Sequence, residues 1–180
     1  MAEPRRWRGR PGKREATPEE FKAMAHALRL RILRLCLHEA LTNKELADRL
    51  GENPATVLHH VRRLVDTGFL RAEKPRTGVR GSREKPYRAT GKSWTLSSEK
   101  FPPDRRLAGG LAMIDAFRAE LLQAGADNVR ELDRLGLKLN EGSVNELVER
   151  IATLVHELAD RPDDPDGDAY GLLIGVHRRA

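Results

Sequence analysis

The side chains with the clearest chemical potential lie between residues 53 and 65, where hydrogen-bonding and basic groups occur without any acidic residue. They are Asn53, Ala55, Thr56, His59, His60, Arg62 and Arg63. Small and hydrogen-bonding groups followed by arginines suit the edges of base pairs in a DNA major groove. An ordinary solvated helix face usually mixes both signs of charge. The pattern therefore favours double-stranded DNA as the partner.

Two short helices joined by a tight turn are predicted to present these side chains. Thr42 and Glu45 form a capping box at the start of the first helix, and Gly51 is its natural stop. Asn53 caps the second helix, a proline follows at its first position, and Gly68 closes it. Two helices connected this tightly cross at a steep angle, so the sequence predicts a helix-turn-helix.

The second helix is predicted to have one buried side and one exposed side. Its apolar residues recur at positions i, i+4 and i+7, which indicates a stripe facing the core. The opposite side carries Thr56, His59 and Arg63. His60 and Arg62 flank this side, and we expect them to be exposed as well.

A basic hairpin is predicted after the second helix. Residues 69–73 and 86–90 have the composition of strands, and the glycine-containing segment between them is basic. Its basic side chains include Arg76, Arg80, Arg83 and Lys85. A long hairpin directly after a recognition helix is a wing, whose arginines can reach phosphates or the adjacent minor groove. The alternative is a basic loop that only keeps the protein soluble.

Three stretches within residues 18–90 resemble the ArsR-type winged-helix bacterial transcription regulators. They read FKAMAHALRLRILRLCL, LTNKELADRLGENPATVLHHVRRLVDTGFL and EKPYRAT. The resemblance implies that the helix containing Thr56, His59, His60 and Arg63 enters the major groove. It also implies a homodimer bound to a pseudo-palindromic operator.

The charge of the chain is divided unevenly along its length. Residues 1–100 contain 23 Lys+Arg and 12 Asp+Glu, a net +11, whereas residues 101–180 contain 10 and 15, a net −5. The basic half contains the predicted helix-turn-helix. A region that binds phosphates is expected to carry such an excess of positive charge. The acidic half would be repelled by DNA and is better suited to assembly or sensing.

We divide the chain into three regions. Residues 1–16 are a flexible basic arm, residues 17–96 a winged helix-turn-helix domain, and residues 97–180 a helical region for dimerisation with a possible effector site. No apolar run approaches the roughly 18–20 residues that cross a bilayer, so no membrane partner is expected. The N-terminus lacks the apolar core of a secretory signal, and a single cysteine fits a reducing compartment. We therefore expect a cytoplasmic protein.

The C-terminal region is predicted to be mainly helical, with helices over 107–123, 127–139 and 143–160, the last one capped by Ser143. Two of these helices carry apolar stripes, which form either an internal core or a dimer seam. The candidate dimerisation residues are Leu107, Leu111, Ile114, Leu147, Ile151, Leu154 and Leu158.

The last residues, AYGLLIGVHRR, alternate as a strand does. This strand needs a partner in the wing sheet, near Leu96 or in the other protomer. The expected fold class is therefore mainly α (α+β).

The residue pattern favours neither a metal site nor an enzyme. Cys36 and His38 are two positions apart and point in different directions on a helix, so we expect no metal site and no cofactor. The chain has no nucleophile elbow, phosphate-binding glycine loop or zinc-protease spacing, so we expect no enzyme. The acidic turn RPDDPDGD lacks the spacing of a calcium loop.

These observations together predict a sequence-specific DNA-binding transcription regulator, most simply a dimeric repressor. Two alternatives stay open. A winged helix can also serve RNA or protein contact, without needing a two-fold pair of recognition helices. The C-terminal region can also hold a small hydrophobic effector, although no residue pattern identifies one.

Overall fold

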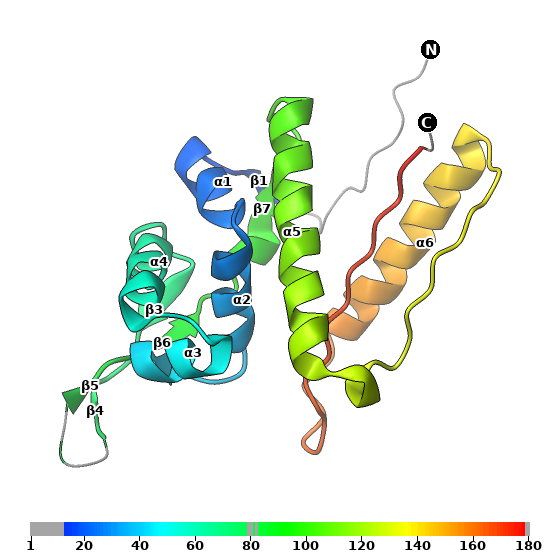
Figure 1. The fold of residues 1–180 in the computed structure, drawn as a ribbon. Helices are drawn as coiled ribbons and strands as arrows, with labels where there is room; N and C mark the ends of the chain where they lie inside the picture. The colour runs from blue at the N-terminus through cyan, green and yellow to red at the C-terminus, as the bar shows by residue number, and fades with distance from the viewer. Residues whose placement is uncertain (1–12, 79–80, 82, 179–180) are drawn as a thin grey trace.

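The computed structural model describes residues 13–78, 81 and 83–178 (Figure 1). Four short helices form one half of the molecule: α1 (Pro18–Met24), α2 (Ala27–Leu35), α3 (Asn43–Leu50) and α4 (Pro54–Asp66). Two longer helices follow in the other half, α5 (Pro103–Ala124) and α6 (Glu141–Ala159). Two single 3-10 turns, η2 (Lys92–Thr95) and η3 (Ala126–Asn128), lie between these elements.

The strands are short and form three small sheets. They are β1 (Arg14–Glu15), β2 (Leu41–Thr42), β3 (Leu70–Ala72), β4 (Arg76–Thr77), β5 (Arg83–Glu84), β6 (Pro86–Ala89) and β7 (Leu96–Ser97). The antiparallel sheet β2-β6-β3 is the base of the hairpin, β4 and β5 pair antiparallel beyond it, and β1 pairs parallel with β7. The predicted fold class, a mainly helical winged helix-turn-helix, is confirmed.

One hydrophobic core fills the winged half. Leu46 of α3, Val57 and Leu64 of α4, and Ile32 of α2 are completely buried, and Phe69 is 1% exposed. These side chains come from the periodic apolar positions of each helix, which is why the helices can share a single core. The core therefore fixes α4 between α2, α3 and the sheet.

Helix α5 lies along α2 and is attached to the winged half (Figure 1). Its inner face consists of small residues, since Ala116 is 4% exposed and a Cβ added to Gly109 would lie 3.3 Å from Phe21 Cζ. The Phe21 ring stacks on Phe101 with centroids 4.2 Å apart. Small side chains on α5 thus let the two halves approach closely.

The C-terminal predictions are partly wrong. The helices expected over 107–123 and 143–160 are present as α5 and α6, but Asn140 rather than Ser143 caps α6, by accepting a bond from the Ser143 N–H. The helix expected over 127–139 is absent beyond η3, because this segment has no surface to pack against and contains Gly136. Residues 169–178 are extended but belong to no sheet in the described chain. A strand without a partner has no ladder to stabilise it.

An ion cluster closes the N-terminal side of the winged half. Glu20 is 6% exposed, and its carboxylate binds Arg14 and Lys92 at 2.6 Å each and accepts the Thr17 N–H at 2.9 Å. Lys92 also donates to the Thr67 carbonyl at the end of α4, at 2.6 Å. Thr17 and Glu20 form a capping box at the start of α1, and β1 places Arg14 and Glu15 in a strand inside the region expected to be a flexible arm.

The rest of that arm, residues 1–12, lies outside the described residues. Within the described ranges, no helix combines the length and apolarity needed to cross a membrane.

We predict that Glu20→Gln costs about 2–3 kcal/mol of stability, because it leaves two cations beside a buried group that no longer balances them. The hydrogen bond from Arg14 holds the pKa of Glu20 far below its usual range, despite burial. A lowered carboxylate pKa contributes stability above the unfolded-state pKa and loses it as the pH falls. Urea titrations of the wild type should thus show stability falling below about pH 4.5.

The Glu20→Gln variant should lose the part of the fall in stability that protonation of Glu20 causes. Glu19→Gln, one residue earlier and exposed, is the matched control and should leave the unfolding midpoint unchanged. Equal midpoints for Glu19→Gln and Glu20→Gln would show that the cluster does not stabilise the fold.

Candidate nucleic-acid interface

The turn between α3 and α4 is fixed by side-chain caps. Thr42 Oγ1 accepts the Glu45 N–H at 3.2 Å, and the Glu45 carboxylate accepts the Thr42 N–H at 2.7 Å. Gly51 ends α3 with φ 66°, a left-handed conformation that a residue with a Cβ adopts at a cost. Asn53 caps α4 by accepting the Ala55 N–H at 2.8 Å, and Asn43 of α3 donates to the Pro54 carbonyl at 2.9 Å. The two helices therefore have one defined crossing.

The outer side of α4 carries most of the side chains that the sequence predicts to contact DNA. Asn53, Ala55, Thr56, His59 and Arg62 are exposed. Arg63 is half-buried rather than fully exposed. The exposed side chains among residues 53–62 are neutral or basic, so this part of the face has the character of a surface for a polyanion, while the last residue of α4, Asp66, is exposed and acidic.

His60 is the exception, and the expectation that it is exposed is wrong. Its side chain is 8% exposed and lies 4.5 Å from the His26 ring and 5.4 Å from the His59 ring, centroid to centroid. Arg29 of α2 donates to His60 Nδ1 at 3.3 Å. The helical period places His60 at the margin of the buried stripe, and only the packing of α1 and α2 against this side decides its burial.

Arg29 organises the contact beneath α4. Besides His60, it donates to the carbonyls of Ala23 at 2.5 Å and Lys22 at 2.7 Å, near the C-terminal end of α1. Because arginine only donates, His60 Nδ1 is the acceptor and the ring of a neutral His60 carries its proton on Nε2. Burial, and then the charges of His26 and Arg29, lower the pKa of His60 to about 4. The ring is thus neutral at physiological pH.

The wing divides its basic residues between two roles. Arg83 and Lys85 are exposed, whereas Arg76 is ion-paired with Glu45 at 2.5 Å and with Glu84 at 3.3 Å. Because Glu45 belongs to the capping box of α3, Arg76 anchors the hairpin to the helix-turn-helix. The sequence predicted Arg76 as a DNA contact and did not reveal this pairing. Arg80 lies outside the described residues.

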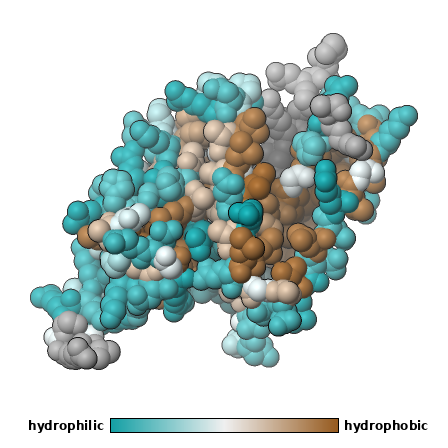
Figure 2. Space-filling model, viewed as in Figure 1, coloured by the Kyte–Doolittle hydropathy of each residue, from teal (hydrophilic) through white to brown (hydrophobic). Residues whose placement is uncertain are grey.

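The predicted dimerisation residues form two apolar sets that the single chain leaves uncovered. On α5, Leu107, Leu111 and Ile114 are 63%, 50% and 51% exposed, on the side opposite the small residues that face α2. On α6, Leu154 and Leu158 are 58% and 51% exposed. Leu147 and Ile151 are half-buried. Figure 2 shows hydrophobic side chains gathered over α5 and the adjoining C-terminal half, beside a mostly hydrophilic winged half.

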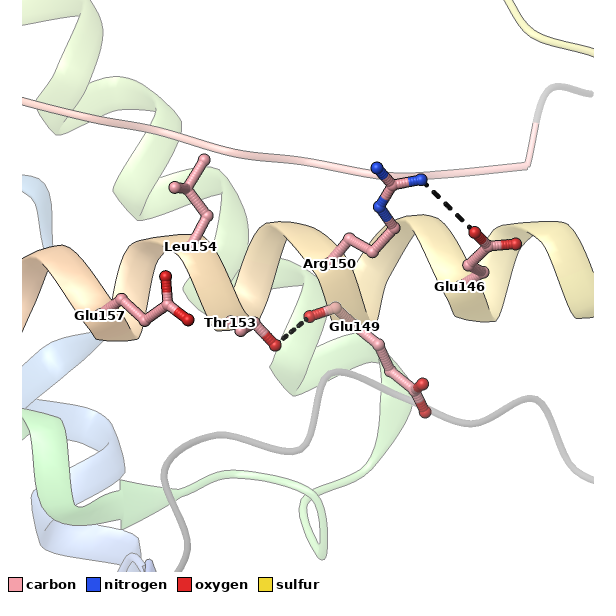
Figure 3. A pocket seen from close by; sticks show the side chains of 6 residues that line it. All are labelled: Glu146, Glu149, Arg150, Thr153, Leu154 and Glu157. Carbon is pink, nitrogen blue, oxygen red and sulfur yellow. Dashed lines mark hydrogen bonds and ion pairs between the residues drawn. The ribbon is translucent and has the colours of Figure 1, made fainter.

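A shallow hollow on α6 is lined by charged residues and one leucine (Figure 3). Its lining consists of Glu146, Glu149, Arg150, Thr153, Leu154 and Glu157. Arg150 pairs with Glu146 at 3.4 Å, and Thr153 Oγ1 donates to the Glu149 carbonyl at 2.9 Å. All six residues belong to one helix, so the hollow is a surface feature and lacks the surrounding walls of a small-molecule site.

The described residues contain no cluster of three or more His, Cys, Asp or Glu side chains arranged to hold a metal ion. Cys36 is completely buried at the end of α2, and burial raises the pKa of its thiol to about 12. Its packing is that of a small apolar residue.

Residues 24–73 match a protein-family model described as a helix-turn-helix domain. The chain contains a helix-turn-helix domain. The matched span runs from the end of α1 to just past β3 and includes α2, α3 and α4. A comparison with curated proteins finds no match to the chain. The helix-turn-helix match supports a DNA-binding regulator, and the ArsR-type assignment stays a prediction.

We predict that the burial of His60 makes the protein less stable in mild acid. Because the pKa of His60 is lowered on folding, the unfolded chain binds more protons between about pH 4 and 6.5, and stability rises with pH across that window. One such group contributes a slope of at most about 1.4 kcal/mol per pH unit.

The measurement is denaturant unfolding at several pH values. His60→Gln should flatten the slope between pH 4 and 6.5, and His177→Gln, which removes an exposed imidazole, should not. A slope that His60→Gln leaves intact would assign the acid dependence to other groups.

The wing arginines should supply affinity that does not depend on DNA sequence. Replacing Arg80 and Arg83 with alanine removes two cations from the hairpin, which should weaken binding to specific and random DNA alike. The slope of log K against log salt should fall by roughly one to two units. Fluorescence anisotropy over a salt series measures this slope. A loss confined to the specific site would mean instead that the wing reads base sequence or groove shape.

Proposed function

We propose that the protein is a sequence-specific DNA-binding transcription regulator of the ArsR type, which acts as a dimeric repressor on a pseudo-palindromic operator. The observation that carries this proposal is the outer face of α4, where Thr56 and His59 project from a helix whose other side is locked into the core. Insertion into a major groove requires a rigid helix, and the residues of α4 from Pro54 to Arg63 include no acid; Asp66, its last residue, is the acidic one on this side.

The basic surroundings of α4 support the same orientation. The exposed N-terminal turn of α4 would bring the positive end of the helix dipole close to where phosphates would lie. Arg83 and Lys85 extend from the wing on the same chain, and Arg76 holds the hairpin against α3. Phosphate contacts from the wing would fix the register in which α4 meets the bases.

The C-terminal half would set the distance between two copies of α4. Two recognition helices must be presented about 34 Å apart to enter successive major grooves on one side of the duplex. Helix α5 is packed on α2, and Gln123 near its end accepts from Arg31 at 2.9 Å and donates to the Arg49 carbonyl. A dimer joined through the uncovered faces of α5 and α6 would therefore hold both helix-turn-helix units in one geometry and cover promoter DNA.

We predict that selection of duplexes from a random DNA library returns an inverted repeat. Two-fold symmetry of the protein imposes two-fold symmetry on the preferred site, with half-sites centred about 10–10.5 base pairs apart or a multiple of this. Sequencing the bound duplexes measures the site. An asymmetric single half-site would contradict the dimer, and the absence of any preferred sequence would favour a winged helix that contacts RNA or protein.

Arg63→Ala should weaken binding to the selected duplex by roughly ten- to a hundredfold, since a bidentate base contact is worth about 1–3 kcal/mol. His59→Ala tests the same face from an exposed position. Lys100→Ala is the matched control, because it removes one positive charge from an exposed site distant from α4 in the sequence. Unchanged affinity for both Arg63→Ala and His59→Ala would refute the assignment of α4 as the recognition helix.

A further inference from the structure

Two extended segments of the C-terminal half, residues 130–139 and 168–178, form no backbone ladder with the rest of the described chain. Within the described part of the chain, no backbone–backbone hydrogen bond involves these residues, and neither segment belongs to a helix or a sheet. Backbone N–H and C=O groups are obligatory hydrogen-bonding groups. Two runs of this length without a ladder are therefore available to a partner.

The side chains of both segments alternate as they do in strands. Leu135, Leu137 and Leu139 occupy every second position and are 80%, 60% and 40% exposed. Along the other segment, Tyr170, Leu172, Ile174 and Val176 do the same, with exposures between 37% and 66%. A period of two puts each apolar set on one face of an extended chain. The pattern fits a sheet with one covered face.

The arrangement of the two segments around α6 has the form of a strand–helix–strand unit. Figure 1 shows both segments running in the same direction, with α6 returning between them. Such a unit ordinarily places its helix across one face of a sheet. Yet α6 has no buried residue in the single chain, although its apolar stripe includes Leu147, Ile151 and Leu154. The helix is present, and the sheet that it would cover is missing.

We propose that a second copy of this chain completes this sheet, with the extended segments of the two protomers hydrogen-bonding across the dimer interface under the apolar stripe of α6. The inference rests on the dimer of the proposed function and names the surface that forms it. It also gives the C-terminal strand its partner. The two intramolecular candidates are excluded in the described chain, because the wing sheet consists of β2, β6 and β3 and the strand near Leu96 pairs with β1.

A second copy fits these edges better than an unrelated protein does. An isologous interface pairs each segment with the same surface of an identical chain, so both protomers satisfy their edges at once. Residues 129–140 contain three basic and two acidic side chains, Arg130, Arg134, Lys138, Glu131 and Asp133. Copies of this segment can therefore approach without strong like-charge repulsion. An uncovered edge with this alternation would otherwise be a template for aggregation.

The sheet would also be coupled to the DNA-binding half. Arg34 of α2 donates to the Tyr170 carbonyl at 2.9 Å, at the start of the second segment. A Cβ added to Gly171 would lie 3.0 Å from an Arg34 nitrogen, so the backbone approaches this arginine closely. Through this contact, a movement of the shared sheet would change the position of α2, which is packed beside α4.

Hydrogen–deuterium exchange of the full chain as a function of protein concentration tests the proposal. Amides of residues 130–139 and 170–176 should exchange almost freely at dilutions where sedimentation shows a monomer. They should exchange at least tenfold more slowly where it shows a dimer. Amides in the middle of α4 are the internal reference and should be protected at both concentrations.

A matched pair of variants separates the sheet from general hydrophobic contact. Ile174→Pro removes one N–H from the proposed ladder and should raise the dimer dissociation constant at least tenfold, whereas Ile174→Val keeps the N–H and should leave it nearly unchanged. Far-UV circular dichroism confirms that the winged half of each variant stays folded.

Each outcome points to a different conclusion. A dimer with freely exchanging segments overturns the shared sheet and leaves the proposed function standing, with the helices alone as the seam. Protection that persists in the monomer overturns it too, because the sheet would then form within one chain. A protein that dimerises with protected segments but shows no sequence preference for DNA supports the sheet and refutes the proposed function.

Discussion

The structure depends on the burial of one side of α4. Val57, Val61 and Leu64 are completely buried against α2, α3 and Phe69, so the opposite side of the helix has a single exposed orientation. Polar contacts then lock the helix at several points. Asn43 binds its first turn, Arg29 binds His60 at its middle, and Lys92 binds the Thr67 carbonyl at its end. Hydrophobic burial supplies most of the energy, and these directional bonds select one geometry.

Helix α5 extends that rigidity into the C-terminal half. Its two sides differ in residue size: Gly109 approaches Phe21 of α1 and Ala116 is buried, whereas Leu107, Leu111 and Ile114 are exposed. Gln123 contacts both α2 and the last turn of α3. A displacement of α5 would therefore disturb the position of these two helices. Gln123 thus joins α5 to α2 and α3 through two hydrogen bonds.

The parts of the fold that sequence reasoning predicts correctly are those fixed by local interactions. The capping box at Thr42 and the stop at Gly51 occur where expected, because caps involve residues within one turn of each other. The burial of His60 depends on how α1 and α2 pack, and the Arg76–Glu45 pair on where the hairpin folds back, so neither follows from periodicity. The helix expected over 127–139 is absent and the C-terminal strand has no partner in the described chain, because the stability of both needs surfaces that no local pattern supplies.

The burial of Cys36 has a consequence for how the protein responds to oxidants. The residue is enclosed by the core, and the Ala89 N–H donates to its carbonyl at 2.9 Å, which ties the end of α2 to β6. Because burial raises the pKa of this thiol to about 12, Cys36 is almost entirely protonated at pH 7. Peroxides and disulfides react with the thiolate form of cysteine, so Cys36 in the folded domain should react slowly with them. Alkylation of this thiol is therefore expected to require opening of the domain, so its rate would report on unfolding.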